Sequence, residues 1–190
     1  MNMAEAKEKL GAKFSFTAED ADRFIQDLKL FKDAKILDIG TGFGSLAITL
    51  AINGYRVLTG EPADDDTKYA KNDWLKNAQK VGVDHLIEFE AFDAAKMPFA
   101  DNRFDAIFSL GSLHHVDETR RQEVLKECIR TTKSDGLICF FEPNQSCLKI
   151  IKEVDPEHPQ AADPHVHAQG LNLELQKKAG TLFDAFVLKK

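Results

Sequence analysis

Short runs rich in β-branched and aromatic residues alternate along this chain with segments of helical periodicity, and this alternation restricts the fold most strongly. Strands that alternate with helices pair in parallel and need crossover connections. We therefore predict an α/β fold, a doubly wound and mostly parallel sheet with helices on both faces. The strand-like runs are KILDIG (35–40), YRVLTG (55–60), LIEFEA (86–91), FDAIFS (104–109) and GLICFF (136–141).

Apolar residues at helical spacing predict where the helices lie between these strands. At the N-terminus, TAED (17–20) fits a capping box, and the apolar stripe behind it predicts a helix on the sheet edge. The stripe consists of Phe24, Ile25, Leu28 and Phe31. Further helices are predicted at 45–53, in the segment with Ala70, Trp74, Ala78 and Val81, and behind a cap at Asp117.

The C-terminal part has a less regular pattern. Residues 153–170 hold three prolines and three histidines, which predicts a loop. LNLELQKKAG (171–180) then predicts a helix, and TLFDAFVLKK (181–190) predicts a last strand with its core at 182–188.

The chain has 190 residues, which fits one domain with a full core. Its net charge is -6, which argues against nucleic-acid binding and against binding to an anionic membrane. The three cysteines form no C-x-x-C pair, the start lacks an apolar signal core, and no apolar run approaches about 18–20 residues. We therefore expect a reduced, cytoplasmic protein.

Three glycines follow the first predicted strand in ILDIGTGFG (36–44). Gly40, Gly42 and Gly44 permit positive φ, and they remove the Cβ atoms that would block a ligand beyond the strand end. A dinucleotide site wants G-x-G-x-x-G, but the third glycine position is Ser45 here. A tight turn without a ligand is the other interpretation.

Acidic residues stand at the ends of three successive predicted strands. Asp38 lies in the first strand, Glu61 closes the second, and Asp93 follows the third. The carboxylate of Glu61 suits both hydroxyls of a ribose, and that of Asp93 suits an exocyclic amino group. Because parallel strands end at one edge of the sheet, the set predicts a ligand with an amine, a ribose and an adenine.

Five motifs stand in this order along the chain: ILDIGTGFG, Glu61, FDAAKMPF (92–99), FDAIFSLGSLHHV (104–116) and SDGLICFFEP (134–143). On these motifs, from Lys35 to Glu142, the sequence resembles the class I S-adenosylmethionine-dependent methyltransferases. The resemblance implies a Rossmann-like fold, S-adenosyl-L-methionine as cofactor and methyl transfer by in-line displacement. The family's sheet has seven strands and ends in an antiparallel hairpin. Only one C-terminal strand is evident here, so the hairpin is trimmed or a strand lies within 160–175.

The resemblance also implies roles for individual residues on the cofactor side. Asp38 and the turn Gly40, Thr41, Gly42 and Gly44 would hold the methionine end, and Glu61 would hold the ribose. Phe92, Asp93 and Ala94 would frame the adenine, with backbone of Ser109 and Leu110 closing the far side. The resulting division is a helical extension (1–34), a cofactor-binding core (35–145) and an acceptor-side part (146–190) of one domain.

On the acceptor side, LHHV resembles the branch of the family that methylates small molecules, so we expect a small-molecule acceptor. His114 is the candidate base, while a role in shaping the pocket is the alternative; His115 and Glu142 are further acceptor-side residues. We expect no metal, and we interpret 153–170 as a solvated loop or lid; a metal site in this histidine-containing loop is the alternative. An NAD-dependent oxidoreductase, a non-catalytic cofactor-binding protein and an aminopropyl transferase are the rival functions. The acceptor atom (O, N, S, C or As) and the oligomeric state stay open.

Overall fold

The computed structural model describes residues 1–70 and 73–190, and it shows one seven-stranded sheet with the order β3-β2-β1-β4-β5-β7-β6. The first five strands run parallel, whereas β7 is antiparallel to both β5 and β6. The strands are β1 (Ile36–Ile39), β2 (Val57–Gly60), β3 (Ile87–Phe89), β4 (Phe104–Leu110), β5 (Thr132–Pro143), β6 (Glu174–Lys178) and β7 (Phe183–Lys189).

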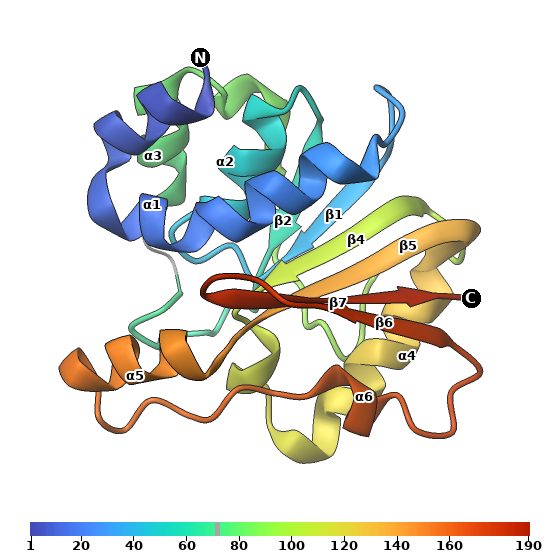
Figure 1. Cartoon of the computed structure of the whole chain (residues 1–190). Coiled ribbons are helices and arrows are strands. Elements are labelled where there is room, and N and C mark those ends of the chain that lie inside the picture. Colours follow the sequence, from blue (N-terminus) through green and yellow to red (C-terminus); the bar gives the residue numbers. More distant parts are fainter. Residues whose placement is uncertain (71–72) are drawn as a thin grey trace.

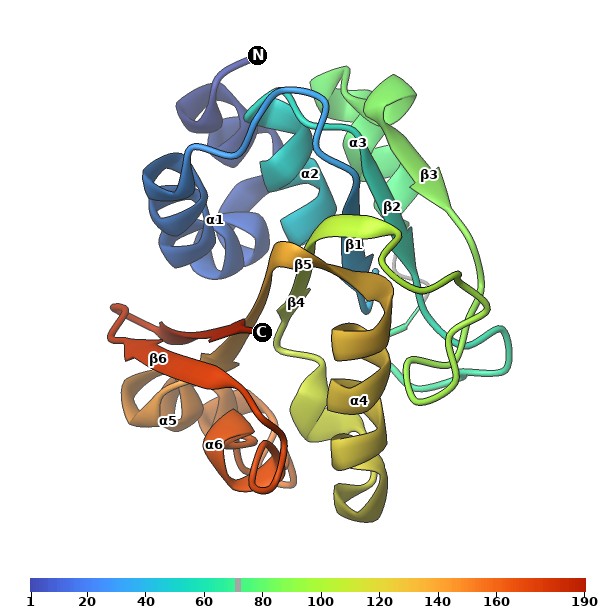
Figure 2. The same ribbon diagram turned by 90° about the vertical axis from the view of Figure 1, so that its right-hand side faces the viewer.

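Helices cover both faces of this sheet, as Figures 1 and 2 show. The helices α1, α2 and α3 lie on one face, and α4 and α6 lie on the other. Alternating strand residues divide the core accordingly, so that Ile36 faces the first group and Leu37 faces α4. The helices are α1 (Met3–Leu28), α2 (Ser45–Ile52), α3 (Trp74–Val81), α4 (Arg121–Thr131), α5 (Gln145–Val154) and α6 (Pro164–His167). The predicted α/β fold is thus confirmed.

The C-terminal hairpin is complete, so both the trimmed sheet and the helix predicted at 171–180 are wrong. Residues 174–178 form β6, an edge strand paired with β7 in which Leu175 lies opposite Leu188. The residues of ELQKK favour helix by propensity. Pairing with β7 and packing of Leu175 against the core override that preference.

The first helix also starts earlier than the sequence predicts. It begins at Met3 behind an Asn2–Glu5 capping box and contains a kink at Gly11. Thr17 therefore lies inside the helix, where its hydroxyl donates to the Lys13 carbonyl, and the capping box predicted at 17–20 is wrong. Phe31, predicted on the apolar stripe, lies beyond the helix and is exposed.

Two other predicted helix starts differ from the structure. Ala70 lies outside α3, which begins at Trp74, and the part of that prediction at 71–72 lies outside the described residues. Asp117 caps a single 3-10 turn (Glu118–Arg120) that leads directly into α4. No helix in the described part of the chain combines the length and the apolar character that crossing a bilayer requires.

Candidate active site

A cavity of about 440 Å³ opens at the carboxyl ends of the parallel strands. This volume lies within the usual range for small-molecule sites, about 300–1,000 Å³. The sequence-predicted residues that line it are Gly40, Thr41, Gly42, Glu61, Phe92, Asp93, Ala94, Leu110, His114 and His115. Four other predicted residues, Asp38, Gly44, Ser109 and Glu142, are not among the lining residues. Three of these four are almost fully buried polar side chains, Asp38, Ser109 and Glu142.

The glycine turn brings backbone against a neighbouring loop as well as against the cavity. Gly40, Gly42 and Gly44 all have positive φ. A Cβ atom on Gly40 would lie 2.1 Å from the Ser112 hydroxyl, so no side chain fits between the turn and the loop after β4. The glycines are therefore needed partly because the turn packs closely against the loop after β4, and not only because a ligand binds there.

Asp38 lies beneath the turn and is 1% exposed. The Thr59 hydroxyl donates to its Oδ2 (2.8 Å), while Oδ1 is buried without a partner among the described residues. Burial raises the pKa of Asp38 to about 7; the Thr59 hydrogen bond lowers it, and the charge of Glu61 raises it further. The side chain is thus an acid whose charge depends on what fills the adjacent space.

Glu61 and Asp93 reach the cavity from the ends of β2 and of the connection after β3. Glu61 is buried, and its Oε2 accepts the Gly42 backbone N–H (3.0 Å), which holds the glycine turn against β2. Asp93 is half exposed and is paired with Arg120 (2.7 Å). Burial raises the pKa of Asp93, but the bonds from Arg120 and the Ala95 backbone outweigh this and lower it overall.

Glu142 and His114 form a buried pair on the far side of the cavity. The Glu142 oxygens accept backbone N–H groups from Leu113 (3.2 Å) and Ala162 (3.1 Å), and Oε2 lies 2.7 Å from Nδ1 of His114. Because both oxygens already accept N–H groups, the network assigns the proton of this last bond to Nδ1. In the neutral imidazole this leaves the lone pair on Nε2, and that atom is buried without a partner among the described residues.

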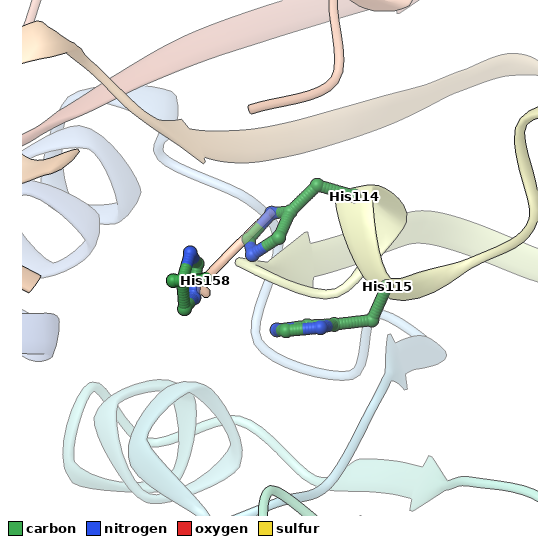
Figure 3. Close-up of side chains that lie close together, drawn as sticks. All are labelled: His114, His115 and His158. Atoms are coloured by element: carbon green, nitrogen blue, oxygen red, sulfur yellow. The ribbon is translucent and has the colours of Figure 1, made fainter. Parts of the chain in front are cut away.

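Two further imidazoles lie beside this pair (Figure 3). The rings of His114 and His115 are 4.2 Å apart between centroids, and His158 lies 5.1 Å and 5.3 Å from them. The Tyr69 ring lies against His115. Burial lowers the pKa of His115, and the two neighbouring imidazoles lower it further because they disfavour a second positive charge; burial likewise lowers the pKa of His158.

Sequence reasoning missed several lining residues, among them Lys13 and Thr17 of α1, Tyr69 and Ser112. The first two lie on α1, which passes over the glycine turn, where the Thr17 hydroxyl oxygen is 2.7 Å from that of Ser45. His158 belongs to the segment that proline content marked as a loop. Its contact with His114 and His115 joins positions more than forty residues apart, and no local pattern indicates such a contact.

Comparison with known proteins assigns the family. A family model described as a methyltransferase domain matches residues 37–140, more than half of the chain. The chain belongs to the class I S-adenosylmethionine-dependent methyltransferases. The matched range begins within β1, includes β2, β3 and β4, and ends within β5, so it contains the strand ends that border the cavity.

Among solved structures, a SAM-dependent methyltransferase from Aquifex aeolicus superimposes with a TM-score of 0.69 at 16% identity, covering 99% of this chain and 98% of that one. Among curated relatives, the 27-O-demethylrifamycin SV methyltransferase of Amycolatopsis mediterranei is 33% identical over 66% of this chain and 46% of its own length. The sarcosine/dimethylglycine N-methyltransferase of Halorhodospira halochloris is 32% identical over 62% of this chain and 40% of its own. This methyltransferase chain thus spans less than half the length of both curated relatives.

Proposed function

We propose that this domain transfers the methyl group of S-adenosyl-L-methionine to a small-molecule acceptor. The observation that carries the proposal is one cavity lined by the glycine turn, Glu61, Asp93 and the His114–His115 pair. Methyl transfer needs alignment of two reactants and exclusion of water, which a cavity of this kind supplies. Both curated relatives named above are methyltransferases whose names state small-molecule substrates.

On the cofactor side, we propose the residue roles that the family resemblance implies. Asp38 and the residues Gly40, Thr41, Gly42 and Gly44 serve the methionine end, and Glu61 serves the ribose hydroxyls. Phe92, Asp93 and Ala94 serve the adenine, with Ser109 and Leu110 behind it. In support, the buried Oδ1 of Asp38 lacks a partner among the described residues, as expected of a carboxylate that awaits a donor or a structured water.

On the acceptor side, we propose His114 as the general base. Its Nδ1 is held by Glu142, and its unpaired Nε2 is the atom that would accept a proton from a hydroxyl, amine or thiol. Once an acceptor is known, His114→Gln should lower the rate by about 10²–10⁴-fold while cofactor affinity is preserved. A decrease of only a fewfold with an unchanged pH–rate profile would indicate that His114 is not the base and has only a structural role.

The activity itself is tested with methyl-labelled cofactor and a panel of small acceptors that offer O, N, S and C nucleophiles. Labelled product from one acceptor class supports the proposal. Cofactor binding without any transfer would favour a non-catalytic cofactor-binding protein. We also propose a cytoplasmic location, which the three buried free thiols Cys128, Cys139 and Cys147 support.

The domain division 1–34, 35–145 and 146–190 and the lid role of 153–170 are part of the same proposal. Contacts of the third segment with the cavity support it. His158 and Ile151 line the cavity, and the Ala162 N–H is bonded to Glu142.

A further inference from the structure

We propose that His114, His115 and His158 form a binding site for one divalent transition-metal ion, zinc above all, at the acceptor end of the cavity. One ring nitrogen of each histidine can be chosen so that all three lie within 4.8 Å of one another. Figure 3 shows the rings of His114 and His115 extending from one turn toward His158, which comes from a separate segment. The cluster thus joins the loop after β4 to the segment after α5.

In two of these imidazoles, the ring nitrogen that would not bind the metal makes the kind of hydrogen bond that metal-bound histidines usually make. Ligating histidines usually donate the second ring N–H to a carboxylate or a backbone carbonyl, which fixes the tautomer. Here Nδ1 of His114 lies 2.7 Å from the Glu142 carboxylate, and Nδ1 of His158 lies 2.9 Å from the Pro159 carbonyl. Both bonds leave Nε2 with its lone pair, and in His114 that atom is buried without a partner among the described residues.

Two of the three ring spacings fit a shared ion. Nitrogen ligands at about 2.0–2.1 Å from a tetrahedral zinc lie roughly 3.4 Å apart, with ring centroids roughly 5 Å apart. The centroid distances from His158 to the other two rings, 5.1 and 5.3 Å, match this value. The His114–His115 distance of 4.2 Å is shorter, so these two rings must move apart when an ion binds. The nitrogens, which lie within 4.8 Å of one another, must approach by up to about 1.4 Å on loading, so the rings must turn when the ion binds.

The donor set selects the kind of ion. Three neutral imidazoles suit zinc, cobalt, nickel or iron, whereas magnesium and calcium prefer oxygen ligands. Three protein ligands leave a fourth position open, which is the arrangement of catalytic rather than structural zinc sites. All three histidines line the cavity, so the open position faces the space proposed for the acceptor.

The role of the ion rests on the proposed methyl transfer, whereas its binding does not. A bound cation lowers the pKa of a thiol or hydroxyl placed in its open position, so the acceptor loses its proton to solvent. The acceptor's electron pair then forms the new bond to the methyl carbon, while the sulfur–methyl bond breaks and its electron pair stays on sulfur. The acceptor class is therefore a thiol or hydroxyl compound. In the loaded protein His114 is a ligand and not the base.

The test uses the full chain without an affinity tag, stripped with a chelator and titrated with Co²⁺ alone, followed by visible absorption and calorimetry. We expect one ion per chain with the intense ligand-field bands of a four- or five-coordinate site. His158→Ala and His115→Ala should each weaken binding by more than about 100-fold, and Glu142→Gln by about 10–100-fold. The matched control is His165→Ala, because His165 is exposed, pairs with Asp163 and lies outside the cluster.

Absence of Co²⁺ binding to the wild-type chain would overturn the proposal, as would binding that His158→Ala and His115→Ala leave unchanged. Two variants are used because His115 is exposed, so its replacement tests the site even if the buried His158 proves necessary for folding. Calorimetry of S-adenosyl-L-methionine with the stripped chain is a separate arm. Cofactor binding without metal binding refutes the ion alone, and metal binding without cofactor binding refutes the proposed function alone.

Discussion

Replacing Glu142 by glutamine should destabilise the protein although the two side chains have nearly the same shape. The carboxylate is 1% exposed and accepts from the Leu113 N–H, the Ala162 N–H and His114 Nδ1. A glutamine amide has one oxygen and one NH₂ group. If NH₂ replaces Oε1, it faces the Leu113 N–H; if it replaces Oε2, it faces the Ala162 N–H.

Either orientation leaves one buried backbone N–H without an acceptor, at a cost of about 1–3 kcal/mol. In the second orientation His114 must also move its proton from Nδ1 to Nε2, which removes the lone pair that faces the cavity. For a chain of this length, about 2 kcal/mol corresponds to a decrease of roughly 4–8 °C in melting temperature.

Thermal unfolding followed by circular dichroism measures the effect. Glu153→Gln on the exposed side of α5 is the matched control and should unfold within about 1 °C of wild type, since exposed substitutions change stability little. A Glu142→Gln melting temperature equal to that of the control would refute the inferred network.

Two further predictions concern buried carboxylates. Asp20 accepts the N–H groups of Thr181, Leu182 and Phe183 and pairs with Arg23, so Asp20→Asn should cost about 2–3 kcal/mol in chemical denaturation. Burial raises the pKa of Asp20 but these bonds lower it overall; the stabilisation is therefore present above about pH 4 and lost at lower pH, and a difference from wild type that stayed constant below pH 4 would contradict this. Asp38 has the opposite sign: its pKa is raised to about 7, so the folded state binds its proton more tightly and loses stability as pH rises from about 4 to 7. Unfolding free energies of wild type and Asp38→Asn between pH 5 and 8 should diverge in favour of the variant, and parallel curves would argue against the assignment.

The sequence was sufficient for the residues that lie at the ends of parallel strands. Periodicity located β1 to β4, and parallel pairing alone brings Asp38, Glu61 and the residues after β4 to one edge of the sheet. Residues whose positions depend on tertiary packing were not predictable in this way. The β6 segment has helix-favouring residues and becomes a strand only by pairing with β7.

On the acceptor side, too, some residues were predictable from the sequence and others depend on tertiary packing. The LHHV motif located His114 and His115, but the position of His158 depends on how a proline-containing segment packs back across the cavity. The bond between Glu142 and His114 links β5 to the turn after β4, and the resulting orientation of the imidazole could not be predicted from spacing. Polar residues on irregular segments are therefore where sequence reasoning was weakest.

Cofactor recognition is tested most directly by calorimetric titration of S-adenosyl-L-methionine into wild type and Glu61→Ala, with NAD⁺ as the competing ligand class. We predict one binding site for S-adenosyl-L-methionine, none for NAD⁺, and affinity about 10–150-fold weaker in the variant, which loses a charged acceptor worth about 1.5–3 kcal/mol. Because Glu61 also holds the Gly42 N–H, a thermal melt must show that the variant is folded. Binding of NAD⁺ instead, or equal affinity of a folded Glu61→Ala for S-adenosyl-L-methionine, would contradict the proposed site.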